Sequence, residues 1–307
     1  MTLDVDRMRG KLIIETGCMK GGKTEALVAC AQRIKRHSKF GLVVFNNSLN
    51  VRDGVDQIAS ENNSSFPAIP ADVHDPHSII REVYEQDKEQ FQDVVIIDEG
   101  NFFDYRLVPV IQQLKKEKRV VIVGGLDLNF RGEPFGPMAA LKLMADEVRL
   151  HHAYCQMVRD GKVCSNPASF TVRLVRAEEA DLHARVSFRK GDNMISGLYY
   201  FAPYYHPTII VEKKSVAAQL PLVVYTTACK DCFQIPGKDK TFQVYKTICR
   251  LGAVKQEKLR ELMKDTHELP LILDFLKKEN WIIESRGRLR AVPFMYHMES
   301  GMFISAE

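Results

Sequence analysis

The sequence predicts an α/β fold built on a mainly parallel sheet, followed by smaller domains of another class. Through residues 11–150, apolar runs typical of buried strands alternate with helix-compatible segments, which is the pattern of βαβ units. From about residue 151 this alternation gives way to scattered cysteines and an aromatic run. The length of 307 residues is itself enough for about two domains. We therefore expect the parallel domain to occupy residues 1–150.

The elements of this first domain can be read in order along the chain. Its strands are the apolar runs LII, GLVVF, DVVIID and RVVIVGGLD, at residues 12–14, 41–45, 93–98 and 119–127. Helical spacing of apolar residues predicts helices over 24–36, 77–91 and 107–118. The polar stretch 59–70 predicts a loop.

An eight-residue motif directly follows the first strand. Residues 17–24, GCMKGGKT, match G-x-x-x-x-G-K-[ST], a P-loop whose backbone N–H groups converge on phosphates. Gly17 and Gly22 permit the tight turn, Lys23 can reach the outer phosphates, and the hydroxyl of Thr24 can coordinate Mg²⁺. The alternative is a chance match in a glycine-rich turn, which the flanking strand and helix make less favourable. The motif predicts a P-loop (RecA-like) sheet that binds a nucleoside triphosphate.

Two acids end a later strand of the same domain. Val94–Ile97 leads into Asp98 and Glu99, at the end of the strand that faces the ligand crevice in open α/β sheets. Asp98 is expected to hold Mg²⁺, directly or through water, and Glu99 to act as a general base on a water or a substrate hydroxyl. The alternative for Glu99 is a solvated residue at a strand end.

Composition limits the remaining classes of function. The 43 Lys and Arg against 39 Asp and Glu give a net charge of +4, too weak to predict nucleic acid or a membrane surface as a partner of the whole molecule. No apolar run approaches the roughly 20 residues that cross a bilayer, and the first eleven residues lack the apolar core of a signal peptide. We expect a cytoplasmic protein whose seven cysteines are reduced thiols or metal ligands.

Further motifs give the chain a resemblance to a known family. They are G-C-M in the P-loop, D-E-G-N-F-F at 98–103, L-D-L-N-F-R-G-E-P-F-G at 126–136, C-S-N-P-A-S-F-T-V-R-L at 164–174, and N-V-R at 50–52 in the place of D-x-R. In this order and over about residues 10–233, the chain resembles the cytosolic, zinc-containing (type II) thymidine kinases. It departs from the family's usual pattern at Lys20, where phenylalanine is usual, and at Asn101, where glutamine is usual.

The resemblance implies transfer of the γ-phosphoryl group of ATP to the 5′-hydroxyl of a deoxynucleoside, with thymidine first among the candidates, as in pyrimidine salvage for DNA synthesis. By carry-over, Glu99 is the catalytic base. The implied phosphate-binding residues are Gly17, Met19, Gly21, Gly22, Lys23, Thr24, Arg52 and Asp98, with Thr24 and Asp98 also holding Mg²⁺. The implied nucleoside-binding residues are Met19, Phe102, Phe130, Phe135, Thr171 and Tyr225. Without the family, the phenylalanines read more readily as core.

The cysteines form two pairs that are suitable for a closed tetrahedral zinc site. Cys229 and Cys232 make a C-x-x-C, whereas Cys155 and Cys164 are separated by an eight-residue insertion in a family pair that is normally C-x-x-C. The resemblance implies structural Zn²⁺, with His151 or His152 as the alternative to Cys155; a redox C-x-x-C is the other alternative. The family's lasso over the base is implied between the pairs, ending at Tyr225, although its two glycines are missing here. We expect a zinc and lasso domain over 151–237.

The remaining residues, 238–307, lie beyond the family's usual end. They predict helices over 241–252, 254–265 and 269–285 and a hairpin over 286–298, an order that resembles a winged helix-turn-helix. The segment has 13 Lys and Arg against 10 Asp and Glu, and three arginines, Arg286, Arg288 and Arg290, fall at the predicted wing. DNA binding through this wing is one reading. A small helical domain that packs on the kinase or joins subunits is the other, and is favoured by the slight charge.

Three classes of function remain open on these grounds. A nucleoside kinase accounts for Glu99, the aromatic blocks and the cysteine pairs together. A nucleotide-sensing, DNA-binding regulator on an inactive or weakly active kinase-like core would account for the altered lasso and the added domain. A P-loop ATPase with another task is the third. The expected partners are a nucleoside and ATP, no membrane, and further copies of the chain, since the family's members are commonly tetramers.

Overall fold

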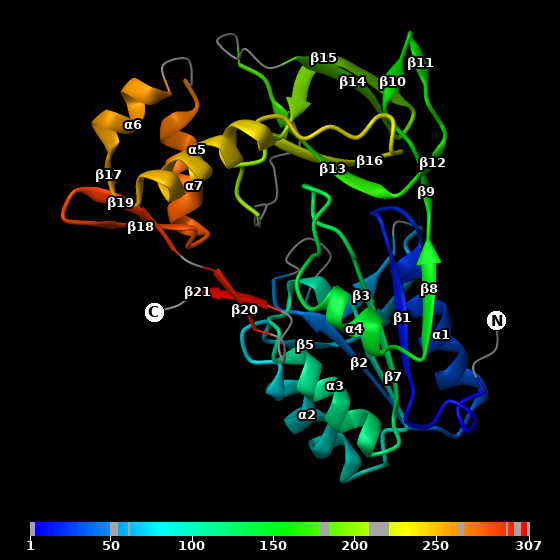
Figure 1. Ribbon diagram of the computed structural model, residues 1–307. Helices are drawn as coiled ribbons and strands as arrows, with labels where there is room; N and C mark the ends of the chain where they lie inside the picture. The colour runs from blue at the N-terminus through cyan, green and yellow to red at the C-terminus, as the bar shows by residue number, and fades with distance from the viewer. Residues whose placement is uncertain are drawn as a thin grey trace. The chain divides into compact units, whose positions relative to one another are not determined.

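The computed structural model describes residues 4–49, 55–60, 62–178, 184–208, 221–263 and 267–292, and the backbone of 294–297 and 302–305 (Figure 1). Contacts between residues divide the chain into two compact units. Unit 1 comprises Met1–Tyr200 and Val211–Phe233, and unit 2 comprises Phe201–Ile210 and Gln234–Glu307. The predicted P-loop and cysteine-bearing regions thus share unit 1. The predicted boundary between them at residue 150 stays a prediction.

A six-stranded parallel sheet forms the centre of the first part of unit 1, as the sequence predicts. Its order is β5-β2-β6-β7-β1-β8, and every pairing in it is parallel. The strands are β1 Leu12–Gly17, β2 Leu42–Asn47, β5 Ile69–Ala71, β6 Val94–Ile97, β7 Val120–Gly125 and β8 Glu147–His151. The carboxyl ends of β1 and β6, which carry the two nucleotide motifs, therefore lie at the same edge of the sheet.

The helices cover both faces of this sheet (Figure 1). They are α1 Lys23–His37, α2 His77–Asp87, α3 Leu107–Lys116 and α4 Met138–Met144. Alternate residues of each strand face opposite sides: Ile13 of β1 packs with the apolar side of α1, whereas Leu12 and Ile14 pack with α2, α3 and α4. The four inner strands are buried almost without interruption, as expected for a parallel sheet that is covered on both faces.

Three features of this part differ from the sequence prediction. The stretch 59–70, predicted as a loop, contains most of the hairpin of β3 Gln57–Ala59 and β4 Ser65–Pro67, followed by β5. The strand β8 and the helix α4 were not predicted either. Ile58, which is fully buried, packs against the α1 side of the sheet together with Phe66 and Ala68, so a few apolar residues in a polar segment hold the hairpin in place.

The second part of unit 1 is β-rich and holds a four-stranded antiparallel sheet in the order β14-β15-β13-β16. These strands are β13 Phe170–Arg176, β14 Arg185–Lys190, β15 Asn193–Phe201 and β16 Val223–Ala228. Two short pairs precede them: β9 Ala153–Tyr154 with β12 Pro167–Ala168, and β10 Val158–Arg159 with β11 Lys162–Val163. The insertion between the first two cysteines is thus a hairpin, and its turn at Asp160 and Gly161 has φ values of 49° and 73°.

Unit 2 has the element order predicted from its resemblance to a winged helix. It contains α5 Lys238–Leu251, β17 Val254–Lys255, α6 Gln256–Leu262, α7 Leu269–Lys278, β18 Ile282–Ser285, β19 Arg288–Ala291, β20 Phe294–His297 and β21 Met302–Ser305. The sheet β17-β19-β18 and the three helices enclose an apolar core. The predicted third helix was too long, because α7 ends at Lys278 and Ile282–Ser285 form β18. The predicted hairpin is correspondingly displaced to β18 and β19, and β20 pairs instead with β21.

None of the helices in the described parts of the chain is both long and apolar enough to cross a bilayer. The longest, α1, has 15 residues, among them several charged side chains.

Candidate active site and metal centre

The P-loop packs closely against the edge strand β8. Gly17 ends β1 with φ 130° and pairs with His151, and a Cβ on Gly17 would lie 2.0 Å from the carbonyl oxygen of His151. A Cβ built on Gly21 lies 3.0 Å from the Cβ of His151. The His151 ring is fixed in turn by a 2.6 Å contact between its Nε2 and the buried carboxylate of Glu15. The loop therefore approaches this strand more closely than any side chain would allow.

Lys23 begins α1 as the motif predicts, and its side chain is buried rather than extended into solvent. Its Nζ donates to the carbonyl oxygen of Cys18 at 2.7 Å, so the ammonium joins the end of the P-loop to its beginning. Burial lowers the pKa of Lys23, while the carboxylates of Glu99 and Asp98 act in the opposite direction. A phosphate group beside this ammonium would add a further opposing charge and favour its protonated form.

Asp98 joins the two nucleotide motifs. Its Oδ2 accepts a hydrogen bond from the Thr24 hydroxyl at 3.0 Å, and its Oδ1 accepts the backbone N–H of Glu99 at 2.8 Å. Glu99 itself has φ 53°, in the left-handed region that side-chain-bearing residues rarely adopt. Such a conformation costs on the order of 1–3 kcal/mol and is found mostly at functional sites. The hydroxyl and carboxylate oxygens of Thr24 and Asp98 are the type of ligand that Mg²⁺ prefers.

A cavity of about 150 Å³ opens over the P-loop. Five of the predicted site residues line it: Met19, Gly22, Lys23, Thr24 and Glu99. It is completed by residues that were not predicted for the site: Lys20, Glu25, Ala59, Ser60, Asn62 and Leu126. Three of these belong to the β3–β4 hairpin, whose Asn62 donates to Glu25 of α1 at 2.8 Å. The sequence could not indicate this wall because the hairpin itself was read as a loop.

The P-loop also contacts β12 and β13 in the second part of unit 1. The backbone N–H of Met19 donates to the Thr171 hydroxyl at 2.9 Å, and the Cys18 thiol donates to the carbonyl oxygen of Ala168 at 3.3 Å. Thr171 lies on β13 and is buried. Two residues predicted to share the nucleoside site, Met19 and Thr171, are therefore in direct contact although they are 152 positions apart.

The predicted aromatic residues fall into two groups. Phe102 and Phe135 meet edge to face with ring centroids 5.5 Å apart. Phe130 is buried under the guanidinium of Arg173, 4.1 Å from its ring centroid, and the same guanidinium donates through Nε to the Tyr225 hydroxyl at 2.9 Å. Arg173 lies within the quoted motif, but it was not selected as a site residue. Its contacts with the Phe130 ring and the Tyr225 hydroxyl join residues far apart in the sequence, so only the fold reveals them.

Asn101 follows the two acids at a position where the resembled family usually has glutamine. Its side chain is buried, and its Oδ1 accepts the backbone N–H of Leu126 at 2.9 Å. A Cβ on Gly125 would come within 2.8 Å of that same oxygen. The Asn101 side chain thus holds the backbone of Leu126, which directly follows β7 and lines the cavity. Arg52, predicted as a phosphate contact, lies outside the described residues, as do residues 209–220 of the predicted lasso.

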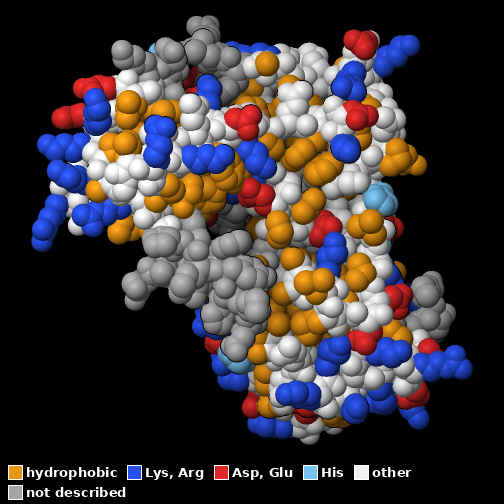
Figure 2. Space-filling view, viewed as in Figure 1, with side chains coloured by type: hydrophobic (Ala, Val, Ile, Leu, Met, Phe, Trp, Pro, Cys, Tyr) orange, Lys and Arg blue, Asp and Glu red, His pale blue; other side chains and the backbone are white. Residues whose placement is uncertain are grey.

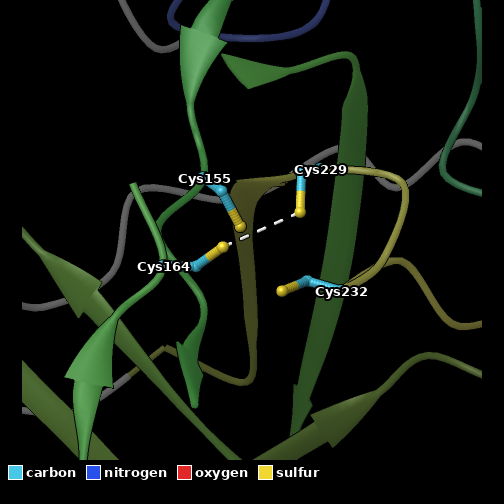
Figure 3. A group of neighbouring side chains, drawn as sticks. All are labelled: Cys155, Cys164, Cys229 and Cys232. Atoms are coloured by element: carbon cyan, nitrogen blue, oxygen red, sulfur yellow. Dashed lines mark hydrogen bonds between the residues drawn. The ribbon is translucent and has the colours of Figure 1, made fainter. Parts of the chain in front are cut away.

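The four predicted zinc ligands come together in unit 1 (Figure 3). The sulfur atoms of Cys155, Cys164, Cys229 and Cys232 all lie within 4.8 Å of one another, and those of Cys164 and Cys229 are 3.8 Å apart. Four thiolates at the usual Zn–S distance of about 2.3 Å from a tetrahedral ion would be separated by about 3.8 Å. The cluster therefore fits a closed zinc site, and Cys155 rather than a histidine completes it.

Local structure aims these sulfurs at one point. The β10–β11 hairpin brings Cys164 back beside Cys155, with the Cys164 N–H donating to the Met157 carbonyl at 2.8 Å. A tight turn returns Cys232 to Cys229, whose carbonyl oxygen accepts the Cys232 N–H at 3.1 Å. Burial raises the pKa of Cys229, but backbone N–H groups of Cys232 and Asp231 and the neighbouring thiols outweigh it, so the net shift of its pKa is downward. A thiolate, the form that binds metal, is thereby favoured at Cys229.

Comparison with known proteins assigns this site to a family. The family model "Thymidine kinase" matches residues 10–184. The thymidine kinase of Coprothermobacter proteolyticus is 41% identical over 180 residues, which is 58% of this chain and 82% of that protein. Thymidine kinases of Bacteroides fragilis and Bacteroides thetaiotaomicron are each 35% identical over 173 residues, 56% of this chain and 79% of theirs. The match includes both nucleotide motifs and the first cysteine pair, so this chain belongs to the thymidine kinase family.

Proposed function

We propose that this protein transfers the γ-phosphoryl group of ATP to the 5′-hydroxyl of thymidine, giving dTMP and ADP. The observation that carries the proposal is the linkage of Glu99 to the P-loop: one carboxylate, Asp98, binds both the Thr24 hydroxyl and the Glu99 backbone. A potential general base is thus fixed at the rim of the same cavity that holds the phosphate-binding loop. Family membership supports the choice of thymidine as acceptor.

In the proposed reaction Glu99 accepts the proton of the attacking 5′-hydroxyl. The P-loop N–H groups and Lys23 bind the β- and γ-phosphates and stabilise the charge that develops on them. Thr24 and Asp98 would hold Mg²⁺, which neutralises phosphate charge when it is bound with ATP. The remaining proposed phosphate contacts are Gly17, Met19, Gly21, Gly22 and Arg52.

For the nucleoside, we propose the predicted set of Met19, Phe102, Phe130, Phe135, Thr171 and Tyr225. Two contacts support it: Phe102 packs on Phe135, and Thr171 receives the Met19 N–H. Met19 lines the P-loop cavity, so its hydrogen bond brings the Thr171 hydroxyl next to a residue of that cavity. A pyrimidine offers a flat face to aromatic side chains and polar edges to hydroxyls. Tyr225 is the least direct contact that we propose, because its hydroxyl already accepts a hydrogen bond from Arg173.

We further propose that Zn²⁺ occupies the four-cysteine cluster as a structural ion, that the protein works in the cytoplasm, and that it forms homo-oligomers as family members do. The regulator with an inactive kinase-like core receives no support from the comparisons, since every relative named above is a thymidine kinase.

A nucleoside-dependent ADP-release assay tests the proposal. We expect turnover with thymidine and ATP, and loss of at least about 100-fold in kcat for Glu99→Gln, because a general base contributes roughly 10²–10⁴-fold. ATP binding by this variant should remain close to that of the natural protein. Glu89→Gln, an exposed glutamate beyond α2, is the matched control for the loss of one carboxylate. Absence of thymidine turnover in zinc-replete protein, or full activity of Glu99→Gln, would refute the proposal.

A further inference from the structure

Unit 2 carries a basic surface that the kinase reaction does not use. On the sheet β17-β19-β18, Lys255 lies directly opposite Arg288, and Arg290 follows two residues along β19 on the same face. All three side chains are exposed, whereas Val254 and Leu289, the neighbouring opposed pair, are buried on the other face. Arg286, in the turn between β18 and β19, is exposed as well. We call these four residues the wing cations.

The wing cations are not neutralised by their own domain. In the described part of unit 2, the acids Glu261, Glu268, Asp274 and Glu284 are each paired with a lysine other than Lys255. No ion pair within the described residues involves a wing cation. Like charges directly opposite each other on a sheet destabilise it, yet Lys255 and Arg288 hold that arrangement without a compensating acid. Such a surface suits an anionic partner.

The turn that joins β18 and β19 places a further wing cation at the tip of the hairpin. Arg286 and Gly287 have φ values of 52° and 67°, as in a two-residue type I′ hairpin turn. That turn favours Asn, Asp or Gly at its first central position, and arginine there costs about 1–2 kcal/mol relative to glycine. The sequence thus carries a strained arginine at the exposed tip of the hairpin. In Figure 2, Lys and Arg side chains gather over the part of unit 2 that carries this hairpin.

From these observations we infer that the β18–β19 wing binds the phosphate backbone of duplex DNA, independently of base sequence. A two-stranded ribbon fits a B-DNA groove, whereas the deep groove of duplex RNA is too narrow for side chains to read. Arg288 and Arg290 are two residues apart, about 6.8 Å along a strand, so both guanidinium groups can reach phosphates of one DNA strand.

The helix that would read bases in a winged helix is unsuited to that role here. Among the exposed residues of α7 are Leu271, which is 59% exposed, and Asp274, which pairs with Lys278 at 2.8 Å. Lys277 is engaged by Glu284 at 2.5 Å. The described part of α7 therefore presents no unpaired cation and an apolar patch, so base-specific contacts are not expected. This distinguishes the inferred activity from that of a sequence-specific regulator.

The experiment measures binding of the full-length protein to a fluorescent 20-base-pair duplex of random sequence, at several salt concentrations. Four phosphate contacts predict a slope of about −3.6 in log K against log salt, and about a 100-fold weaker affinity at 200 mM than at 50 mM salt. Changing Arg286, Arg288 and Arg290 together to Gln should weaken binding by about tenfold or more and bring the slope close to −1.

The matched control removes three positive charges elsewhere in unit 2: Lys240, Lys258 and Lys278, all exposed and paired with acids, are changed to Gln. Its affinity should stay within about threefold of the natural protein. Fluorescence of Trp281, the only tryptophan, which packs in the core of unit 2 on Phe242 and Tyr245, shows whether each variant is folded.

Equal loss in the wing variant and the control, or binding that the wing variant retains, would overturn the inference. So would preference for one DNA sequence, for duplex RNA, or for vesicles containing phosphatidylserine over duplex DNA. Because nucleoside phosphorylation is not read in this assay, its outcome is independent of the proposed kinase reaction.

Discussion

Replacing Gly17 with alanine tests whether contact with β8 fixes the position of the P-loop. A Cβ at this position would lie 2.0 Å from the carbonyl oxygen of His151, and an ordinary contact needs at least 3.4 Å. The end of β1 and His151 must therefore separate by about 1.4 Å, the difference between these two distances. This displacement also strains the 2.6 Å contact between His151 and Glu15.

The expected cost has two parts. Alanine at φ 130° is strained by about 1–3 kcal/mol, and overpacking of a closed contact adds about 1–3 kcal/mol. The sum is about 2–6 kcal/mol, located in β1 and its neighbours. Since misplacement by about 1 Å can cost 10²-fold in rate, kcat/KM for ATP should fall by roughly 100-fold.

Gly191→Ala is the matched control. Gly191 also has positive φ, 60°, but a Cβ there meets nothing within 4 Å, so only the backbone cost of about 1–2 kcal/mol applies. Trp281 lies in unit 2, so its fluorescence would miss the change; hydrogen exchange of peptides from β1 and β7 measures stability at the right place. If Gly17→Ala keeps kcat/KM within threefold of the natural protein, the close contact with His151 does not position the loop.

Three further outcomes follow from other contacts. Thr24→Val should lower kcat/KM by at least about tenfold, with Thr24→Ser retaining most activity, because the hydroxyl contacts Asp98 and is the proposed Mg²⁺ ligand; equal activity of both variants would contradict this role. Cys232→Ser should reduce zinc per chain below half an equivalent by elemental analysis, whereas the exposed Cys249→Ser should leave it unchanged. Asp87→Asn should cost about 1–3 kcal/mol at pH 7 because the charge of Arg119 stays buried. Burial raises the pKa of Asp87, but hydrogen bonds from Arg119 and Gln92 lower it by more, so the net shift is downward. The loss of stability in Asp87→Asn should therefore be full at pH values above the ordinary pKa range of Asp, and should shrink as the pH falls through the lowered pKa. Thermal unfolding at several pH values measures it.

The sequence was sufficient for those parts of the site that lie within short motifs. The loop 17–24 and the acids 98–99 each follow an apolar strand, and parallel strands bring their carboxyl ends to one edge of the sheet. The C-x-x-C spacing indicated the pair Cys229 and Cys232, the family resemblance implied the pair Cys155 and Cys164, and the structure brings all four together. Local pattern and global position agree in each of these cases.

What could not be predicted depends on contacts between distant segments. His151 contacts the P-loop because it pairs with Gly17. The two residues are 134 positions apart and belong to no common motif. Arg173 gains its place only when β13 and β16 pair and bring Tyr225 beside it.

Two misread elements did leave a local signal. The helix α7 stops before Trp281 because Asn280 takes a left-handed conformation with φ 56°, a common way to end a helix, although the apolar pattern continues. The β3–β4 hairpin has Asn63 at φ 62° in its turn, and an Asn-rich turn between short β-compatible runs favours a hairpin.

The contacts of β13 link the cysteine cluster to the P-loop. At its start, Thr171 receives the Met19 N–H of the P-loop, and in register Thr171 pairs with Thr227 of β16, two residues before Cys229. The backbone of Thr227 also accepts the N–H of Gln156, which follows Cys155. Zinc that draws the four sulfurs together would hold both ends of this pairing, and with it the hydroxyl that positions Met19. A structural ion in this cluster would thus also help to fix the position of Thr171 relative to the P-loop.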